Sequence, residues 1–478
     1  MKLGLFDPID RQRVTTLTDQ AVIHGPGHVQ LAHEAAVQSI VLLQHPEGIL
    51  PLDPTAPGKT LAVIGPLANL TDAFMGDYSA KACPGSAPAG FGNQSDAVKT
   101  ATWCLRTALQ EITTANAGGE TTFAAGCDDP NCATEDNATA VATASAADTV
   151  VMILGLVTTR VPYQGGPGNT NSESRDRATV GLPGRQAALA EAVIAVGKPT
   201  VLVVVGGGSV SVDFAKGKPH VAVVAAGFGG EAGASALSSV LFGASNPSAR
   251  LAATIYNQAD FTAVCGTARC MNDMSMQAGS GRSYRYLRTA PSWPFGAGMS
   301  FTSFSISIIP HRPSTSPAPP GVNSGASAGV NGGDVLLLLA PGLTPSKLAP
   351  TGTVVSLGLK VTNTGSRTGA NVATVFATWA GGELPRGFSV TPLRWMVSFG
   401  KTEDLEPGGA IELDLSFPCE ELKLVNSAGD EVVLAGNYAI TVFDGTTTLA
   451  PVTVTISESR VISKLPPPPA NHDQPPIY

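Results

Sequence analysis

The sequence predicts an α/β domain with a parallel sheet, followed by an all-β domain, and three observations carry this prediction. Apolar β-branched segments alternate with segments of helical periodicity over roughly the first 300 residues. A Pro/Ser/Gly/Ala-rich stretch follows. Beyond Thr351 apolar residues recur at every second position, and turns such as Asn-Thr-Gly and Pro-Gly-Gly separate the runs, which indicates a β-sandwich.

In the first part, helix and strand candidates are joined by short glycine-rich segments. Such alternation is typical of a parallel sheet covered on both faces by helices, an α/β sandwich. In order, we expect a helix feeding a short strand (29–44), a strand (59–68), helices (96–113 and 136–148), a strand (149–156), a helix (184–196), a strand (199–207), a strand (220–227) and a helix (230–243).

Composition restricts the partners. The net charge is −8 and the pI is near 5.4, without a lysine-rich stripe, which argues against nucleic acid and against an anionic membrane surface. The longest apolar runs fall far short of the ~20 residues that cross a bilayer. We expect no cofactor and no group of metal-binding residues. The sequence does not predict the oligomeric state.

Four of the seven cysteines form two close pairs, Cys127 with Cys132 and Cys265 with Cys270. Without nearby histidines, this spacing favours local disulfides over zinc, with free thiols as the alternative. Three sequons, at Asn69, Asn93 and Asn137, fit a secreted glycoprotein. The opening "MKLGLFDPID" lacks the apolar stretch of a signal peptide, so we expect either a cytosolic protein or a missing true N-terminus.

Two motifs are rejected as sites. Gly325-Ala-Ser-Ala-Gly329 matches the G-x-S-x-G of serine hydrolases but has no strand before it and no helix after it. The segment 227–232 matches G-x-G-x-x-A after a strand and before a helix. Because no acidic residue ends the next strand, a tight turn is favoured over a dinucleotide site.

Several sequence blocks follow one another in a recognisable order: "LAHEAAVQSIVLLQHPEGILPL", "FMGDYSA", "SRDRATVGLPGRQAALAEAV", "FGGEAGASALSSVLFGASNPSARLAATIY" and "GRSYRYL". In this order they resemble glycoside hydrolases of family 3, with the greatest similarity to the plant-type β-xylosidase / α-arabinofuranosidase branch. The later block "VTNTGSRTGANVATVF" resembles the fibronectin type III-like domain that ends such enzymes. The resemblance covers nearly the whole chain.

The resemblance implies a division of the chain. Family members begin with a (β/α)₈ barrel that carries the nucleophilic aspartate, and this chain opens at a segment resembling the exit from that barrel. The expected parts are a residual barrel segment (1–28), the α/β sandwich domain (29–308), a Pro/Ser/Gly-rich linker or insert (309–350), the fibronectin type III-like domain (351–458) and a disordered tail (459–478).

The implied chemistry needs two carboxyl groups, about 5–5.5 Å apart in a retaining glycosidase. The family's nucleophile block is not found, because the only Ser-Asp pair, Ser95-Asp96, lies in a polar stretch entering a helix. Counting back from Asp176-Arg177 in the family pattern E-x-E-x-x-D-R places the second glutamate at Glu173 and the first at Asn171. Glu173 is the candidate acid if the second glutamate of the pattern protonates the leaving group, with a surface carboxylate paired to an arginine as the alternative. If the first glutamate is the acid, Asn171 occupies its position and this chain has lost the acid as well.

Four further residues are candidates for contact with the sugar: Asp77 and Tyr78 in "FMGDY", Arg177, and Arg282 in "GRSYRYL". For each of these four residues, the alternative to contact with the sugar is a purely structural role that supports the fold. The resemblance implies a hydrolase of β-linked pentosides at the ends of xylan-derived oligosaccharides or polysaccharides, extracellular or in the cell wall. We expect this chain to be incomplete and inactive alone, and the rival hypothesis is a non-catalytic carbohydrate-binding or scaffold protein.

Overall fold

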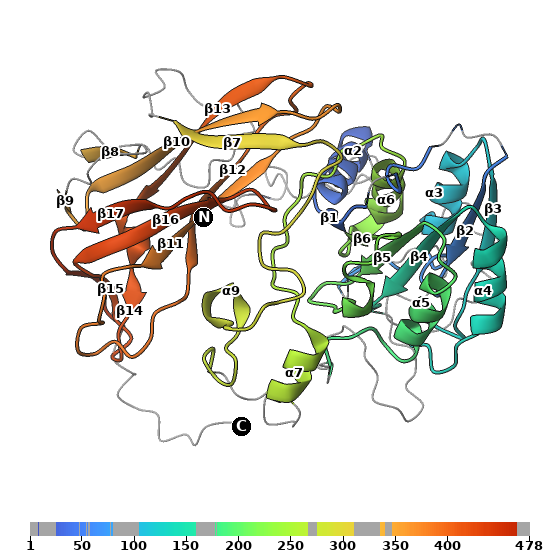
Figure 1. Cartoon of the computed structure of the whole chain (residues 1–478), viewed down its shortest axis with the longest axis horizontal. Helices are drawn as coiled ribbons and strands as arrows, with labels where there is room; N and C mark the ends of the chain where they lie inside the picture. The colour runs from blue at the N-terminus through green and yellow to red at the C-terminus, as the bar shows by residue number, and fades with distance from the viewer. Residues whose placement is uncertain are drawn as a thin grey trace.

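A computed structural model of the chain contains an α/β domain and a β-sandwich, connected by the segment that carries α7 (Gln258–Cys265) and α9 (Ser283–Tyr286) (Figure 1). The described residues are 25–46, 48–53, 58–76, 105–158, 179–265, 275–309, 335–339 and 347–465, together with the single positions 8, 55, 78, 79 and 177.

The α/β domain is built on a six-stranded sheet of order β1-β6-β5-β4-β2-β3. All neighbouring strands are parallel except β1, which runs antiparallel to β6. We expected a parallel sheet, and the structure shows a parallel sheet of five strands with one antiparallel strand at its edge. Its central strands are almost continuously apolar, as strands covered on both faces must be. The strands are β1 (Val41–Gln44), β2 (Thr60–Ile64), β3 (Glu120–Ala124), β4 (Thr149–Gly155), β5 (Thr200–Val205) and β6 (Val221–Ala225).

Helices cover both faces of this sheet. One buried cluster joins α2, α3 and α6 to one face, and a second joins α4 and α5 to the other. The α/β sandwich is thereby confirmed. The helices are α2 (Pro26–Val37), α3 (Ala108–Ala115), α4 (Asn137–Ala146), α5 (Gln186–Ile194) and α6 (Gly233–Leu241), with short 3₁₀ turns η4 (Asp213–Ala215) and η5 (Gly230–Ala232).

Two local expectations differ from the structure. The helix predicted over 96–113 begins only at Ala108 within the described residues, because the Thr107 hydroxyl accepts the Gln110 amide and the Gln110 side chain accepts the Thr107 amide. This capping box fixes the start of a helix. Strand β3 was not expected, because its sequence "ETTFA" is largely polar, as suits a strand at the sheet edge.

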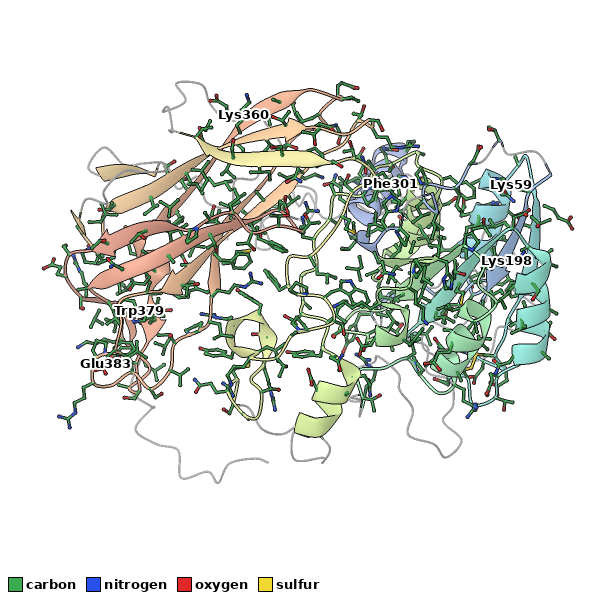
Figure 2. The ribbon with its side chains drawn as sticks, viewed as in Figure 1. Lys59, Lys198, Phe301, Lys360, Trp379 and Glu383 are labelled. Carbon is green, nitrogen blue, oxygen red and sulfur yellow. A yellow bond between two sulfur atoms is a disulfide. The ribbon has the colours of Figure 1, made fainter. Side chains whose placement is uncertain are left out.

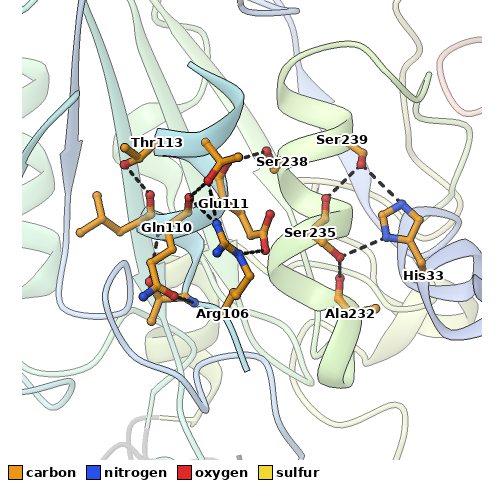
Figure 3. Close-up of polar contacts among 12 residues, drawn as sticks. His33, Arg106, Gln110, Glu111, Thr113, Ala232, Ser235, Ser238 and Ser239 are labelled. Carbon is orange, nitrogen blue, oxygen red and sulfur yellow. Dashed lines mark hydrogen bonds and ion pairs between the residues drawn. The ribbon is translucent and has the colours of Figure 1, made fainter. Parts of the chain in front are cut away.

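Polar contacts hold the helices of one face together (Figure 3). His33 on α2 lies between two serines of α6, with its Nδ1 3.1 Å from Ser235 Oγ and its Nε2 3.4 Å from Ser239 Oγ. Ser235 Oγ donates to the Ala232 carbonyl, and Ser239 Oγ lies 3.0 Å from the Ser235 carbonyl. Because the Ser235 hydroxyl proton is directed to a carbonyl, this His–Ser cluster joins two helices rather than activating a nucleophile.

The second domain consists of two main sheets that enclose one apolar core, with a small three-stranded sheet beside them. One sheet has the order β13-β10-β7, with β8 also paired to β10, and the other has the order β12-β11-β16-β17-β9. The strands are β7 (Phe304–Ile309), β8 (Val335–Leu339), β9 (Lys347–Leu348), β10 (Thr353–Asn363), β11 (Val372–Trp379), β12 (Trp395–Lys401), β13 (Ala410–Pro418), β14 (Leu424–Val425), β15 (Glu431–Val433), β16 (Gly436–Phe443), β17 (Val452–Ile456) and β18 (Arg460–Ser463), with η6 at Cys419–Leu422.

Four strands lie outside the expected limits of this domain: β7, β8, β9 and β18. β9, near the end of the expected linker, pairs with β17. β7 falls in the range assigned to the α/β domain, yet it pairs with β10. β8, within the expected linker, pairs with another part of β10, and the apolar run "VLLLL" explains why this part of a Pro/Ser/Gly-rich stretch forms a strand. β18 pairs with β15, so residues 460–463 belong to a sheet and not to a disordered tail.

Candidate functional site

The carboxyl ends of the parallel strands lie at one edge of the sheet, where open α/β sheets bind ligands. β2 has β3 on one side and β4 on the other. The connection from β2 to β3 therefore runs toward one side of the sheet, whereas the connections from β3 through β4 to β6 run toward the other, and the point of reversal lies between β2 and β4. The loops after β2, β4, β5 and β6 leave from this edge. A cavity of about 320 Å³ lies beside the loops that follow β5 and β6, lined in part by Gly206, Ser209 and Gly227.

The segment that carries Tyr78 lies at this edge. The Thr158 hydroxyl, three residues beyond β4, donates to the Met75 carbonyl at 3.0 Å, and the Gly230 amide donates to the Phe74 carbonyl at 3.0 Å. Tyr78 is 83% exposed, which leaves its ring accessible to a large ligand. Asp77 lies outside the described residues.

Arg177 joins two loops of the same edge. Its Nη2 donates to the Ser209 carbonyl at 2.7 Å and its Nη1 to the Gly181 carbonyl at 3.4 Å. Burial lowers the pKa of the Arg177 guanidinium from its usual value. Both contacts join the loop after β5 to the segment entering α5, so the structure gives Arg177 a bracing role.

The segment that carries Arg282 is connected to this edge by the next residue, Ser283. The Ser283 amide donates to the Tyr256 hydroxyl at 2.7 Å, and the Tyr256 amide donates to the Ser209 hydroxyl at 3.3 Å. Arg282 is the residue before α9 and is half-buried. The described segments that carry Tyr78, Arg177 and Arg282 therefore converge on one edge, although the sequence separates them by about two hundred residues.

Glu173, Asn171 and Asp176 lie outside the described residues. The nearest described residues on either side, Thr158 and Arg177, both contact the carboxyl edge. Cys270 is also outside the described ranges, so the structure does not describe the expected pair with Cys265.

Asp72 is a carboxyl group at this edge that the sequence did not single out. It precedes the "FMGDY" block, its Oδ1 is buried without a hydrogen-bond partner among the described residues, and burial raises the pKa of its carboxyl group. Nothing in "NLTDAF" distinguishes this aspartate from a surface residue, because its burial comes from tertiary packing.

Gln186, the first residue of α5, holds the end of β4 in place. It is fully buried, its Oε1 accepts the Gly155 amide at 2.8 Å, and its Nε2 donates to the carbonyls of Gly155 (3.1 Å) and Pro130 (2.7 Å). Pro130 lies in the loop that the disulfide Cys127–Cys132 closes. Gln186 thus connects the strand before the Glu173 segment to the disulfide loop.

Removing this disulfide with the double variant Cys127→Ala/Cys132→Ala is expected to lower the free energy of unfolding by about 2 kcal/mol, since it closes a short loop. Urea denaturation of the variant measures the change. Reduction of the unmodified chain with a phosphine should reproduce it, whereas equal stability of the reduced and oxidised chains would contradict the prediction.

The rejected dinucleotide motif forms a turn, with positive φ at both Gly227 (62°) and Gly230 (65°). Within the described ranges, no three or more His, Cys, Asp or Glu side chains gather in a way that could hold a metal ion. None of the helices in the same ranges combines the length and hydropathy needed to span a bilayer.

Comparison with known proteins gives relatives with named activities. The chain is 30% identical over 450 residues to "Probable beta-D-xylosidase 6" of Arabidopsis thaliana, covering 92% of this chain and 51% of the relative. It is 31% identical over 482 residues to "Probable exo-1,4-beta-xylosidase bxlB" of Aspergillus fumigatus, covering 98% of this chain and 53% of the relative. The chain thus spans about half the length of these curated relatives.

Solved structures share the fold. A GH3 exo-β-xylosidase (XlnD) in complex with a xylobiose aziridine probe superposes with a TM-score of 0.68 at 23% identity, covering 92% of this chain and 50% of that one. A GH3 β-glucosidase of Bifidobacterium adolescentis gives a TM-score of 0.64 at 25% identity, covering 95% and 57%. The model of the glycosyl hydrolase family 3 C-terminal domain matches residues 40–301, more than half of the chain, and the chain therefore belongs to glycosyl hydrolase family 3.

Proposed function

We propose that this chain forms the C-terminal part of a β-xylosidase-like hydrolase that releases β-linked pentoses from the ends of xylan- or arabinoxylan-derived chains. The observation that carries the proposal is the convergence of the Tyr78, Arg177 and Arg282 segments on the carboxyl edge of the sheet. The activities named for the relatives support the reaction class.

In this proposal Glu173 donates a proton to the oxygen of the leaving group. Arg177 holds the loops around it, and Asp77, Tyr78 and Arg282 contact the sugar. A retaining mechanism also needs a carboxylate nucleophile on the opposite side of the glycosidic bond. We assign that nucleophile to the part of the relatives' length that this chain does not span.

We further propose that the β-sandwich is a fibronectin type III-like domain and that the intact protein is a glycoprotein secreted to the cell wall or another extracellular space. The disulfide Cys127–Cys132 supports an oxidising compartment. Peptide mapping by mass spectrometry of protein from its native source would test this, through glycans on the sequons at Asn69, Asn93 and Asn137.

The purified 478-residue chain is expected to hydrolyse an aryl β-xyloside no faster than buffer, because it supplies the acid without the nucleophile. Release of the aryl alcohol measures this directly. Turnover that is lost when an internal Asp or Glu is changed to its amide would overturn the assignment of the nucleophile.

The proposal as a whole is tested on the protein encoded by the complete transcript, obtained by mapping its 5′ end. In that protein Glu173→Gln should lower kcat/KM, which reports formation of the glycosyl-enzyme, by about 10²–10⁴ on alkyl xylosides and much less on dinitrophenyl xyloside, whose leaving group needs no proton. Glu191→Gln, on the exposed side of α5, is the matched control and should leave kcat/KM unchanged. A full-length protein that binds xylan oligosaccharides without cleaving them would favour the scaffold hypothesis instead.

A further inference from the structure

The short helix α9 and the residue before it lie between the two domains, and contacts from both domains hold them (Figure 1). On the side of the α/β domain, the Ser283 amide donates to the Tyr256 hydroxyl at 2.7 Å. On the side of the β-sandwich, the Leu393 amide, just before β12, donates to the Arg285 carbonyl at 2.6 Å. The segment that carries Arg282 is therefore held by the β-sandwich as well as by the α/β domain.

Tyr284 contacts its surroundings through both its ring and its hydroxyl. The ring stacks on Phe295, with 4.2 Å between the ring centroids and 19° between the ring planes. It also lies edge-on to Phe376 of β11, at a centroid distance of 5.8 Å. The Tyr284 hydroxyl accepts the Met396 amide of β12 at 3.4 Å. Aromatic pairs in such geometries shift an equilibrium by roughly two- to twelvefold beyond the effect of burying their area.

Phe295 is anchored in the α/β domain, because the amide of the next residue, Gly296, donates to the Leu251 carbonyl at 2.8 Å. Phe295 also lies edge-on to Phe376, at a centroid distance of 6.1 Å. Tyr284, Phe295 and Phe376 thus form one aromatic cluster, which we call the junction rings. The cluster takes one ring from α9, one from the α/β domain and one from the β-sandwich, so it joins all three.

Ser283 has an unfavourable backbone conformation at the point where the contacts of the two domains meet. Its φ is +53°, in the left-handed region that residues other than glycine rarely adopt. A residue remains in such a conformation only where the surrounding contacts determine it. Ser283 lies between Arg282 and Tyr284, so its backbone sets the direction of Arg282 relative to the junction rings. Without the ring of Tyr284, Ser283 can relax to an ordinary φ, and Arg282 would turn with it.

We propose that Tyr284 is a positioning residue: it couples the β-sandwich to Arg282 and thereby sets how strongly the carboxyl edge binds the sugar. This inference rests on the proposed function, in which Arg282 contacts the sugar. Tyr284 itself does not touch the sugar. The β-sandwich therefore affects the affinity for the substrate without supplying a residue to the site.

The test uses the full-length protein. Tyr284→Leu should raise KM for an aryl β-xyloside and the inhibition constant of xylose by about three- to tenfold, and change kcat less than about twofold, because the lost contact holds the bound sugar. Tyr284→Phe keeps the ring and should restore both constants to within about twofold. Arg282→Ala should raise both constants at least as much, and adding Tyr284→Leu to it should have no further effect, since Tyr284 acts through Arg282.

Tyr438→Phe is the control for a loss of stability in the β-sandwich. The buried Tyr438 hydroxyl donates to the Leu434 carbonyl and accepts the Leu434 amide, both at 3.0 Å. Its ring packs on Trp379, which Figure 2 shows at the end of the β-sandwich away from the α/β domain. The variant should destabilise the domain and leave KM and the inhibition constant unchanged. An equal rise of these constants in Tyr438→Phe and Tyr284→Leu would overturn the positioning role.

Hydrogen exchange of the 478-residue chain tests the positioning without catalysis. Tyr284→Leu should accelerate exchange of the Ser283 amide and leave that of the Gly155 amide, at the end of β4, unchanged. Unchanged exchange at Ser283, or an active full-length Tyr284→Leu variant with unchanged KM, would overturn the positioning role alone. A full-length protein that neither cleaves xylosides nor binds xylose would overturn the proposed function itself, and this inference would fail with it.

Discussion

Replacement of Gly155 by alanine is expected to destabilise the α/β domain by more than about 4 kcal/mol, the largest effect of any single substitution considered for this chain. Gly155 ends β4 with a φ of +136°, and an added Cβ would lie 2.0 Å from the Val205 carbonyl oxygen and 2.7 Å from the Val205 nitrogen. Both atoms belong to the paired backbone of β5, so neither can move aside without breaking the β4–β5 pairing.

Urea denaturation followed by circular dichroism measures this effect. Gly197→Ala is the matched control, because Gly197 also has a positive φ (+81°) but no atom within 4 Å of an added Cβ. Its expected cost is about 1 kcal/mol, from the backbone conformation alone. Equal costs for the two variants would show that the contact with Val205 does not limit this position.

The substitution Gln186→Leu is expected to cost about 3 kcal/mol. The leucine matches glutamine in size but leaves the amide and carbonyl of Gly155 and the carbonyl of Pro130 buried without these partners. Each unsatisfied buried group costs about 1–3 kcal/mol, in part offset by the gain in apolar burial. Hydrogen exchange of the Gly155 amide should accelerate, because its acceptor is the Gln186 side chain.

Gln30→Leu is the control for this change. Gln30 is an exposed residue of α2 whose side chain contacts Glu34, and its replacement is expected to change stability by less than about 0.5 kcal/mol. If Gln186→Leu were as mild as Gln30→Leu, the three hydrogen bonds of Gln186 would contribute little to the position of β4.

The sequence predicts elements whose signal is local, and it fails where pairing partners are distant. The runs "TVVMILG" and "TVLVVV" are identified as buried strands because both faces of a central parallel strand are covered. Strand β3, with the sequence "ETTFA", is not predicted, because an edge strand needs fewer apolar residues and its pattern resembles that of a loop. β18 is stabilised by pairing with β15, about thirty residues earlier, which a local pattern does not reveal.

The candidate site shows the same limit. The blocks around Tyr78, Arg177 and Arg282 are identified in the sequence through a family resemblance, but their convergence depends on backbone carbonyls and on Ser209 and Tyr256. Nothing in the pattern around Ser209 or Tyr256 marks them as the residues that connect these segments. Likewise, Gln186 occurs in an ordinary helix start, and only its full burial shows its role.

β7 and β8 lie along the same edge of β10. β7 pairs with residues 358–363 and β8 with residues 353–357, so the two ends of the intervening residues 310–334 are fixed a few positions apart on one strand. β10 thereby holds Ile309 and Val335 within five residue positions of each other along one strand. Breaking the pairing of β10 would release both of these residues at once, so the integrity of this single strand controls where the chain leaves the β-sandwich and where it returns.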